Sequence, residues 1–262
     1  MSSTTKVIVA VFAVLLVAVV AGVIWVRSTA TTPEPDLAVA PATPLPEPSP
    51  TPSLAERLSE RLAGTTLATS DAVVRELVGQ LSSRPALAKW LANEDLVRRF
   101  VAAVDNIANG VSPTGQLAFM RPEKTFKVVE RGDRSFIDPV SYDRYDLATQ
   151  VFLSLDTEGT VALYRELEPL IDEAYREISP PGSRFSDRLD AAMNHLLEVV
   201  PPAEPPEVRR KVVTWVYVDE SLEGLSGAQR QLLRMGPDNV LLIKSKLREL
   251  KSAIRAASST AS

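Results

Sequence analysis

The sequence predicts a mainly α-helical domain with a small antiparallel β-sheet, and this domain follows an N-terminal transmembrane helix. Three observations lead to this fold class. An uncharged apolar run lies near the amino terminus, and apolar residues recur at helical spacing over most of the chain beyond Leu54. Two short stretches rich in β-branched and aromatic residues interrupt this helical pattern.

The apolar run extends from Val7 to Val26 and contains twenty residues without a charge. A helix of this length spans about 30 Å, which is the thickness of the hydrocarbon core of a bilayer. The run is longer than the apolar region of a cleaved signal peptide, so we expect an uncleaved anchor. The small residues Ser28–Ala30 leave cleavage open as an alternative. Lys6 favours a cytoplasmic amino terminus, which places the main domain in the periplasm, on the bacterial inner membrane.

Residues 27–52 form a proline-rich linker, because eight of these 26 residues are proline. Proline favours an extended chain, so this segment is typical of a spacer. The chain is therefore expected to divide into a short tail (1–6), the transmembrane helix (7–26), the linker (27–52), one helical domain (53–256) and a disordered tail (257–262).

The domain is expected to begin with four helices. Ser53 and Glu56 have the spacing of a capping box before the first helix. Ser70 is predicted to start the second helix, and Pro85 opens a short third one. The fourth carries an apolar face from Val97 to Ala108, and Asn109-Gly110 ends it.

A β-hairpin is predicted in the middle of the chain. Residues 125–130 and 134–138 flank Arg131-Gly132-Asp133, where the glycine suits a tight turn. An adhesion role for this RGD tripeptide is the less favoured interpretation. The segment Lys211–Asp219 is expected to add a third strand.

Helices are expected over residues 141–155, 158–178, 186–200 and 238–256, with another starting at Ser226. Pro169 should kink or divide the second of these helices. No internal repeat is evident in the sequence.

Three segments carry a resemblance to a known family: FVAAVDNIANGVSP (residues 100–113), LYRELEPLIDEAYREI (163–178) and LLRMGPDNV (232–240). Over about Ser70 to Ile254 the chain resembles the bacterial domain of unknown function 3014 family. The resemblance implies a single-pass bacterial membrane protein, and it implies no reaction, ligand or catalytic residue.

Composition excludes several kinds of chemistry. The chain has no cysteine and one histidine, which excludes disulfides, thiol catalysis, cysteine-ligated metals and multi-histidine metal sites. The net charge of −4 gives no general attraction to nucleic acid. We therefore expect no metal, no cofactor and no nucleic-acid partner.

An acidic region lies between Asp133 and Glu177, with eleven acidic and four basic residues. A hydrolase could use two of these carboxylates as acid and base, and the candidate catalytic residues are Asp143, Asp146, Asp172 and Glu173. A solvated acidic helix face is the more ordinary interpretation of the same pattern.

Two tyrosines and the histidine provide further candidates. Tyr142 and Tyr145 could form an aromatic binding platform, although core packing explains them better. His195 is a candidate general base if an acid such as Asp190 lies beside it, but a structural histidine is the favoured interpretation.

The segment around Gly236 has two interpretations. Arg234 and Asn239 could help to bind an anion at the start of the last helix, although Asp238 would oppose the anion and a simple helix stop is favoured. The basic C-terminal helix is expected to pack with its charges outward.

These observations favour a membrane-anchored envelope protein whose helical domain is a binding or scaffold module. Its expected partners are the lipid bilayer, through Val7–Val26, and an envelope protein or polymer. The alternative is an extracytoplasmic hydrolase with paired carboxylates.

Overall fold

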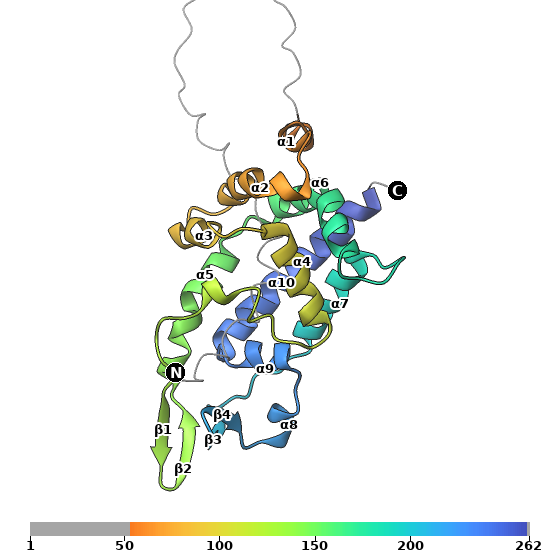
Figure 1. Cartoon of the computed structure of the whole chain (residues 1–262). Coiled ribbons are helices and arrows are strands. Elements are labelled where there is room, and N and C mark those ends of the chain that lie inside the picture. Colours follow the sequence, from red (N-terminus) through yellow and green to blue (C-terminus); the bar gives the residue numbers. More distant parts are fainter. Residues whose placement is uncertain (1–52, 261–262) are drawn as a thin grey trace, which may run out of the picture.

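The structure is a computed structural model, and it describes residues 53–260 of the chain. Most of these residues are helical, and a small antiparallel sheet extends from one end of the helical body (Figure 1). The sheet lies at the opposite end from helices α1 (Leu54–Leu62) and α2 (Ser70–Gly79). The mainly helical fold class is confirmed for this part of the chain.

The first helices follow their local sequence signals. Ser53 and Glu56 form the expected capping box: Ser53 Oγ accepts a hydrogen bond from Glu56 N at 3.2 Å, and the Glu56 carboxylate accepts one from Ser53 N at 2.6 Å. Pro85 is the first residue of α3 (Pro85–Trp90). Helix α4 (Leu96–Ala108) ends just before Gly110, which has a φ of +71°.

The sheet has four strands rather than the three expected. Strands β1 (Val128–Arg131), β2 (Arg134–Ile137), β3 (Glu207–Lys211) and β4 (Thr214–Tyr217) pair antiparallel in that order. The expectation of one strand over Lys211–Asp219 was wrong, because the chain reverses at residues 212–213 and β4 pairs back onto β3. The sheet is thus two hairpins side by side, joined through β2 and β3.

The region expected to be one helix over residues 141–155 is also divided. Two 3₁₀ turns, η4 (Pro139–Ser141) and η5 (Asp143–Tyr145), precede α5 (Asp146–Leu153). Ser141 explains the division, because its hydroxyl accepts from Lys127 N at 2.7 Å and donates to Lys127 O at 2.9 Å. These bonds fix the chain beside the start of the hairpin and delay the helix.

Helix α6 (Thr157–Arg176) runs unbroken for 20 residues, although Pro169 lies inside it. Pro169 does not divide the helix. Its neighbour Glu168 is exposed, as is Pro169 itself, so water can reach this side of the helix where a backbone bond is missing.

The last helices are α7 (Phe185–Leu197), the short α8 (Glu220–Glu223), α9 (Gly227–Leu233) and α10 (Pro237–Thr260). Helix α10 continues four residues past the expected domain end at residue 256. It crosses the middle of the helical body and packs against α5, α6 and α7 (Figure 1).

The order of elements occurs twice, which the sequence did not reveal. A helix, a hairpin, a short helical turn, a helix and a long helix form a first unit (residues 96–176), and the same order forms a second unit (185–260). From the hairpin onward, several element boundaries keep the same spacing. The strands β2 and β4, the ends of α5 and α9, and the starts of α6 and α10 are each 80 residues apart.

The expectation that the chain has no internal repeat was therefore wrong. Only six of the 49 residue pairs between 128–176 and 208–256 are identical, which explains why the sequence hides it. Burial is better preserved than identity. Both members are buried in the pairs Ala148/Ala228, Phe152/Leu232, Leu167/Leu247 and Leu170/Leu250.

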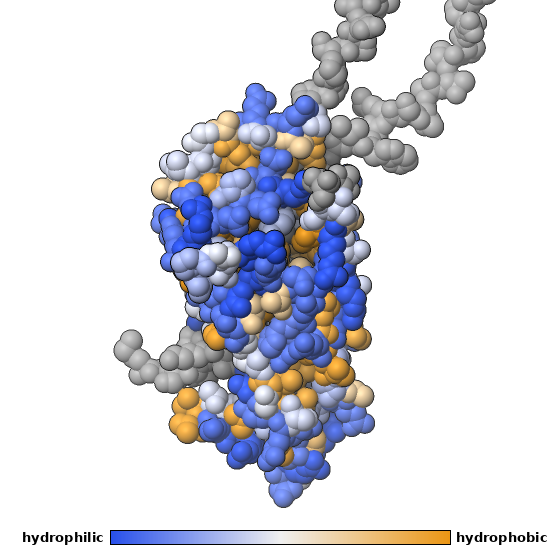
Figure 2. All heavy atoms as spheres, turned by 90° about the vertical axis from the view of Figure 1, so that its right-hand side faces the viewer, coloured by the Kyte–Doolittle hydropathy of each residue, from blue (hydrophilic) through white to orange (hydrophobic). Residues whose placement is uncertain are grey.

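The two units share one hydrophobic core. Helix α4 of the first unit packs against α7 of the second, and α6 packs against α10. Phe100 and Phe185, from α4 and α7, are both fully buried with ring centroids 5.4 Å apart. Hydrophilic residues cover much of the face in Figure 2, with apolar residues scattered between them.

No helix within residues 53–260 is long and apolar enough to cross a membrane. The predicted span Val7–Val26 and the linker 27–52 lie outside the described residues.

Candidate functional site

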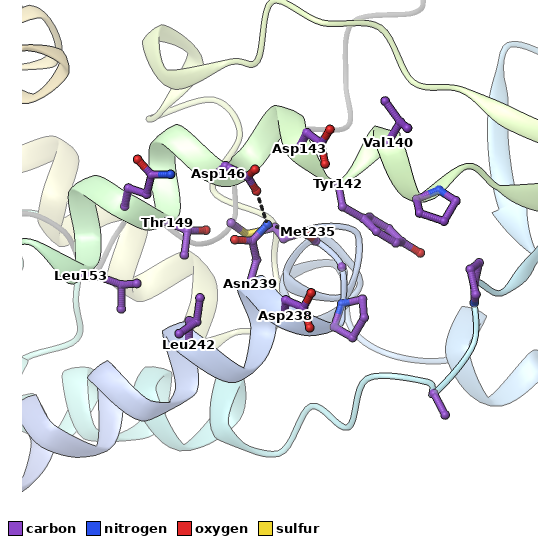
Figure 3. Close-up of a pocket in the computed structure, with 16 residues that line it drawn as sticks. Val140, Tyr142, Asp143, Asp146, Thr149, Leu153, Met235, Asp238, Asn239 and Leu242 are labelled. Carbon is purple, nitrogen blue, oxygen red and sulfur yellow. Dashed lines mark hydrogen bonds between the residues drawn. The ribbon is translucent and has the colours of Figure 1, made fainter.

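A pocket of about 640 Å³ lies where the first unit meets the start of α10 (Figure 3). One wall comes from η4, η5 and α5 of the first unit, and the other from the junction of α9 and α10. Residues 203 and 205 of the loop before β3 close one side. The pocket is therefore built from both units.

Gly236 lets these two walls approach each other. It has a φ of +90°, and an added Cβ would lie 2.7 Å from Tyr142 Cδ2 and closer still to Cγ. A side chain at this position would displace the ring, so the glycine is needed for both its backbone conformation and its small size. Burial raises the pKa of Tyr142 to about 12, so its hydroxyl remains protonated at neutral pH.

Asn239 connects the two walls by a hydrogen bond. Its Nδ2 donates to Asp146 Oδ1 at 3.1 Å and to Met235 O at 3.0 Å, as Figure 3 shows for the first. Asn239 is buried and Asp146 is half-buried. The sequence candidates Tyr142, Asp143, Asp146 and Asn239 thus all line one pocket.

Comparison of the two units shows why polar groups are free in this pocket. In the second unit Ser226 and Gln229 form a capping box at the start of α9. The residues 80 positions earlier are Asp146 and Thr149, at the start of α5, which has no side-chain cap. The Asp146 carboxylate turns to Asn239 instead, so this pair does not cap its helix.

Thr149 has a polar atom with no partner. The residue is 1% exposed, and its buried Oγ1 makes no hydrogen bond to the described residues. Thr149 lines the pocket, and in Figure 3 its hydroxyl points toward Asn239. A buried hydroxyl without a partner costs free energy, so this arrangement needs an explanation.

The charge of the pocket is entirely negative. Asp143, Asp146 and Asp238 line it, and none of its lining residues is a lysine or arginine. The Asp143 and Asp238 side chains make no hydrogen bond or ion pair with other residues in 53–260. No group of three acidic or histidine side chains within this part of the chain is arranged to hold a metal ion. The charge of its lining therefore favours a positively charged group over an anion.

A second groove, of about 710 Å³, differs in its charge balance. It lies between α6, α7 and the end of α10, and its carboxylate Asp190 is neutralised by Lys251 at 2.8 Å and Arg255 at 3.1 Å. Burial alone would raise the pKa of Asp190, but the hydrogen bond and charge of Lys251 and the charge of Arg255 lower it. The lining of this groove carries three acidic and three basic residues, so it has no net charge.

Tyr145 and Arg234, also candidates for binding, lie outside the pocket lining. Tyr145 is 3% exposed and its hydroxyl accepts a hydrogen bond from Arg144 at 2.9 Å. Arg234 lies over the ring of Tyr217 at 5.9 Å. Tyr145 belongs to the hydrophobic core, and Arg234 donates to Trp215 O of β4 at 3.4 Å, so neither side chain lines the pocket.

The four candidate catalytic carboxylates are divided between two places. Asp143 and Asp146 share the pocket, whereas Asp172 and Glu173 are exposed on α6 and line neither hollow described above. A site that uses all four is therefore not formed.

His195 lies in a separate structural cluster. Its Nε2 is 2.7 Å from Ser226 Oγ, and Gln229 Nε2 donates to His195 O at 3.0 Å. Asp190 pairs with Lys251 and Arg255 and does not orient the histidine. Because Ser226 also caps α9, this cluster joins α7 to α9, as expected of a structural histidine.

Sequence reasoning missed Thr149 and underestimated Asp238. Thr149 gives no signal in the sequence, because only the fold shows that its hydroxyl is buried without a hydrogen-bond partner. Asp238 was considered only as an obstacle to an anion, and its position next to Gly236-Pro237 was the available signal.

The model of the family described as protein of unknown function (DUF3014) matches residues 96–251. The chain belongs to the DUF3014 family. The DUF3014 match begins at the first residue of α4 and ends within α10, so it covers the first unit, the second unit up to residue 251, and the pocket between them. Searches of curated proteins and of solved structures found no match for this chain.

Proposed function

We propose that this DUF3014 protein is a single-pass membrane protein of the bacterial envelope whose helical domain binds a cationic segment of another envelope component. Val7–Val26 would anchor it in the inner membrane, and residues 27–52 would tether the domain on the periplasmic side. The bound segment would present a lysine or arginine side chain to the pocket between the two units.

The observation that carries this proposal is the unbalanced charge of the pocket. Three carboxylates line it without a cation, and two of them have no partner within the described residues. Two unit charges 4 Å apart interact by about 4 kcal/mol at an effective dielectric constant of 20, so an entering cation is strongly favoured over an anion. Tyr142 and the apolar residues of the lining suit the methylene stem of a lysine or arginine.

The arrangement supports binding better than hydrolysis. A general acid needs a desolvated carboxyl group that keeps its proton, and a partner carboxylate that stays ionised. Asp143 is exposed, and the half-buried Asp146 carboxylate is already held by a hydrogen bond from Asn239, so neither group is the desolvated carboxyl that a general acid needs. The hydrolase alternative would therefore require another group as the general acid.

Binding can be tested with the full chain in lipid nanodiscs and tetralysine as the probe. We expect tetralysine to bind, its fully acetylated form not to bind, and salt to weaken the complex. The double variant Asp143→Asn/Asp238→Asn should weaken binding at least about tenfold, since it removes two unpaired charges.

Asp172→Asn/Glu173→Gln is the matched control, because it removes the same charge from an exposed surface outside the pocket. We expect it to change the affinity less than about twofold. Equal weakening by the two double variants would contradict the pocket as the binding site.

Anchoring and topology have their own test. Protease added to spheroplasts should digest residues 53–260, while carbonate washing should leave the chain in the membrane. A fully protected domain would contradict the periplasmic placement.

A further inference from the structure

The two hairpins of the sheet have the same backbone plan and different tips. Each closes through a two-residue turn, at 132–133 in the first unit and 212–213 in the second, 80 residues apart. The first turn residue has a positive φ in both, +66° at Gly132 and +54° at Val212. Hairpin turns of this kind require such angles, which glycine adopts without strain.

Val212 is the exception to that rule. A β-branched residue at positive φ is strained, and Val212 is 85% exposed, so burial does not compensate for the strain. Its neighbour Val213 is 43% exposed. The corresponding turn of the first unit is Gly132-Asp133, which is unstrained and polar. The second hairpin therefore presents an apolar tip that folding alone does not explain.

The charges around the two tips differ as well. The ten residues 128–137 carry two acidic and two basic side chains, whereas residues 208–217 carry three basic and no acidic ones. Ser135 donates to Glu130 at 2.8 Å within the first hairpin, and Arg134 donates at 2.9 Å to Glu207, the first residue of β3.

The three cations of the second hairpin lack such partners. Arg209, Arg210 and Lys211 are exposed and make no ion pair with the described residues. Arg210 donates only to Val212 O, at 3.4 Å. An apolar tip beside unpaired cations matches the chemistry of an anionic lipid surface, in which apolar side chains enter the headgroup region and cations meet phosphate.

We propose that the tip of the β3–β4 hairpin docks on an anionic membrane surface, with Val212 and Val213 in the headgroup region and Arg209–Lys211 on the lipid phosphates. The inference rests on the proposed anchoring, which holds the domain near a bilayer. The 26 linker residues can span about 80 Å at 3.1 Å per residue. That reach is several times the radius of gyration of about 17 Å expected for 208 residues, so the end opposite α1 can reach the membrane.

A single cysteine can report on this contact, because the chain has none of its own. Full-length Val213→Cys would carry an environment-sensitive nitrobenzoxadiazole label, and Asp133→Cys, at the same position of the first hairpin, is the matched control. Both are placed in vesicles of phosphatidylcholine alone or of an equimolar mixture with phosphatidylglycerol.

We expect a blue-shifted emission and quenching by doxyl-labelled lipid for the label at residue 213 only in the mixture, and a water-like emission at residue 133 in both. Replacing Arg209, Arg210 and Lys211 with glutamine should weaken this contact by about fivefold per cation. Equal emission at residues 213 and 133 in the mixture would overturn the proposal.

Failure of the anchor is distinguishable from failure of the docking. Loss of the chain from carbonate-washed membranes would contradict anchoring, and the labelled chain could then be titrated with excess vesicles for the same readout. Protection of residue 213 in cells, combined with a water-like emission in both kinds of vesicle, would assign the tip to a protein partner and overturn the lipid proposal.

Discussion

The first and second units share a backbone plan and a core, but their surfaces have opposite charge. Residues 128–176 contain eleven acidic and five basic side chains, while residues 208–256 contain five acidic and ten basic ones. The buried pairs, such as Leu167/Leu247, remain apolar in both. Core packing therefore constrained both copies alike, whereas the positions that do not serve packing diverged.

The cap positions show the same divergence in detail. Ser226 and Gln229 stabilise the start of α9, whereas their counterparts Asp146 and Thr149 face the pocket and leave α5 uncapped. We interpret the second unit as the one whose polar residues stabilise the fold. The first unit holds comparable residues in a less stable arrangement that is available to a ligand, as is common at functional sites.

The largest effect is expected at the contact between the units. Gly236→Ala should lower the free energy of unfolding by about 3 kcal/mol or more, because the new Cβ is strained at positive φ and collides with the Tyr142 ring. Urea unfolding of the full chain would measure this.

Gly79→Ala is the control, since Gly79 lies in α2 and nothing lies within 4 Å of a Cβ added there. This variant should have unchanged or slightly higher stability. A loss below 1 kcal/mol for Gly236→Ala would show that the two walls of the pocket can separate freely.

The second-largest effect on stability is expected at the N-terminal cap of α9, in the second unit. Gln229→Ala should destabilise the protein by about 2 kcal/mol, because it removes the capping box and leaves His195 O without its side-chain donor. Thermal unfolding is a suitable measurement. An unchanged melting temperature would contradict a structural role for this cluster.

Exchanging the turn residues tests the comparison of the hairpins. Gly132→Val should cost about 1–2 kcal/mol, because it introduces the strain that Val212 already bears. Val212→Gly should leave stability unchanged or raise it, since relief of strain offsets the entropy of glycine. Chemical unfolding of both variants would check the signs, and a clear loss for Val212→Gly would mean that Val212 serves the fold.

The pH dependence of stability gives a smaller effect. Burial raises the pKa of Tyr142 to about 12 in the folded chain, whereas an exposed tyrosine has a pKa of about 10, so the unfolded chain loses this proton first as the pH rises. The stabilisation is fully present below pH 10 and is lost as the pH rises toward 12. Tyr142→Phe should therefore reduce the loss of stability in this window by about 1 kcal/mol, discounted for the residue's partial exposure. An unaltered pH profile in Tyr142→Phe would show that the ring is not buried against Gly236.

Much of the fold follows from local sequence. The capping box at Ser53, the stop at Gly110 and the turn at Gly132 are short-range signals, and each was predicted correctly. The second hairpin was missed because Val212-Val213 is a poor turn by composition and reads as the middle of a strand. The repeat was missed because it preserves burial, which depends on tertiary packing, rather than residue identity.

The sequence indicated several residues of the candidate site, but it did not indicate that they lie together. Tyr142, Asp143, Asp146 and Asn239 were each predicted, but for three different purposes, because nothing local connects residue 146 with residue 239. Tyr145 is one helical turn from Tyr142 and yet points into the core. Which tyrosine faces a pocket depends on how the units pack, and that information is absent from the local pattern.

Thr149→Val tests most directly whether the first unit holds polar groups for a ligand at the expense of stability. The variant removes a buried hydroxyl that has no partner, so without a ligand the free energy of unfolding should rise by about 1 kcal/mol. With saturating tetralysine, the gain in stability that the probe gives the original chain should shrink. A variant that is less stable without the probe, or that is stabilised by tetralysine as much as the original chain, would contradict this interpretation.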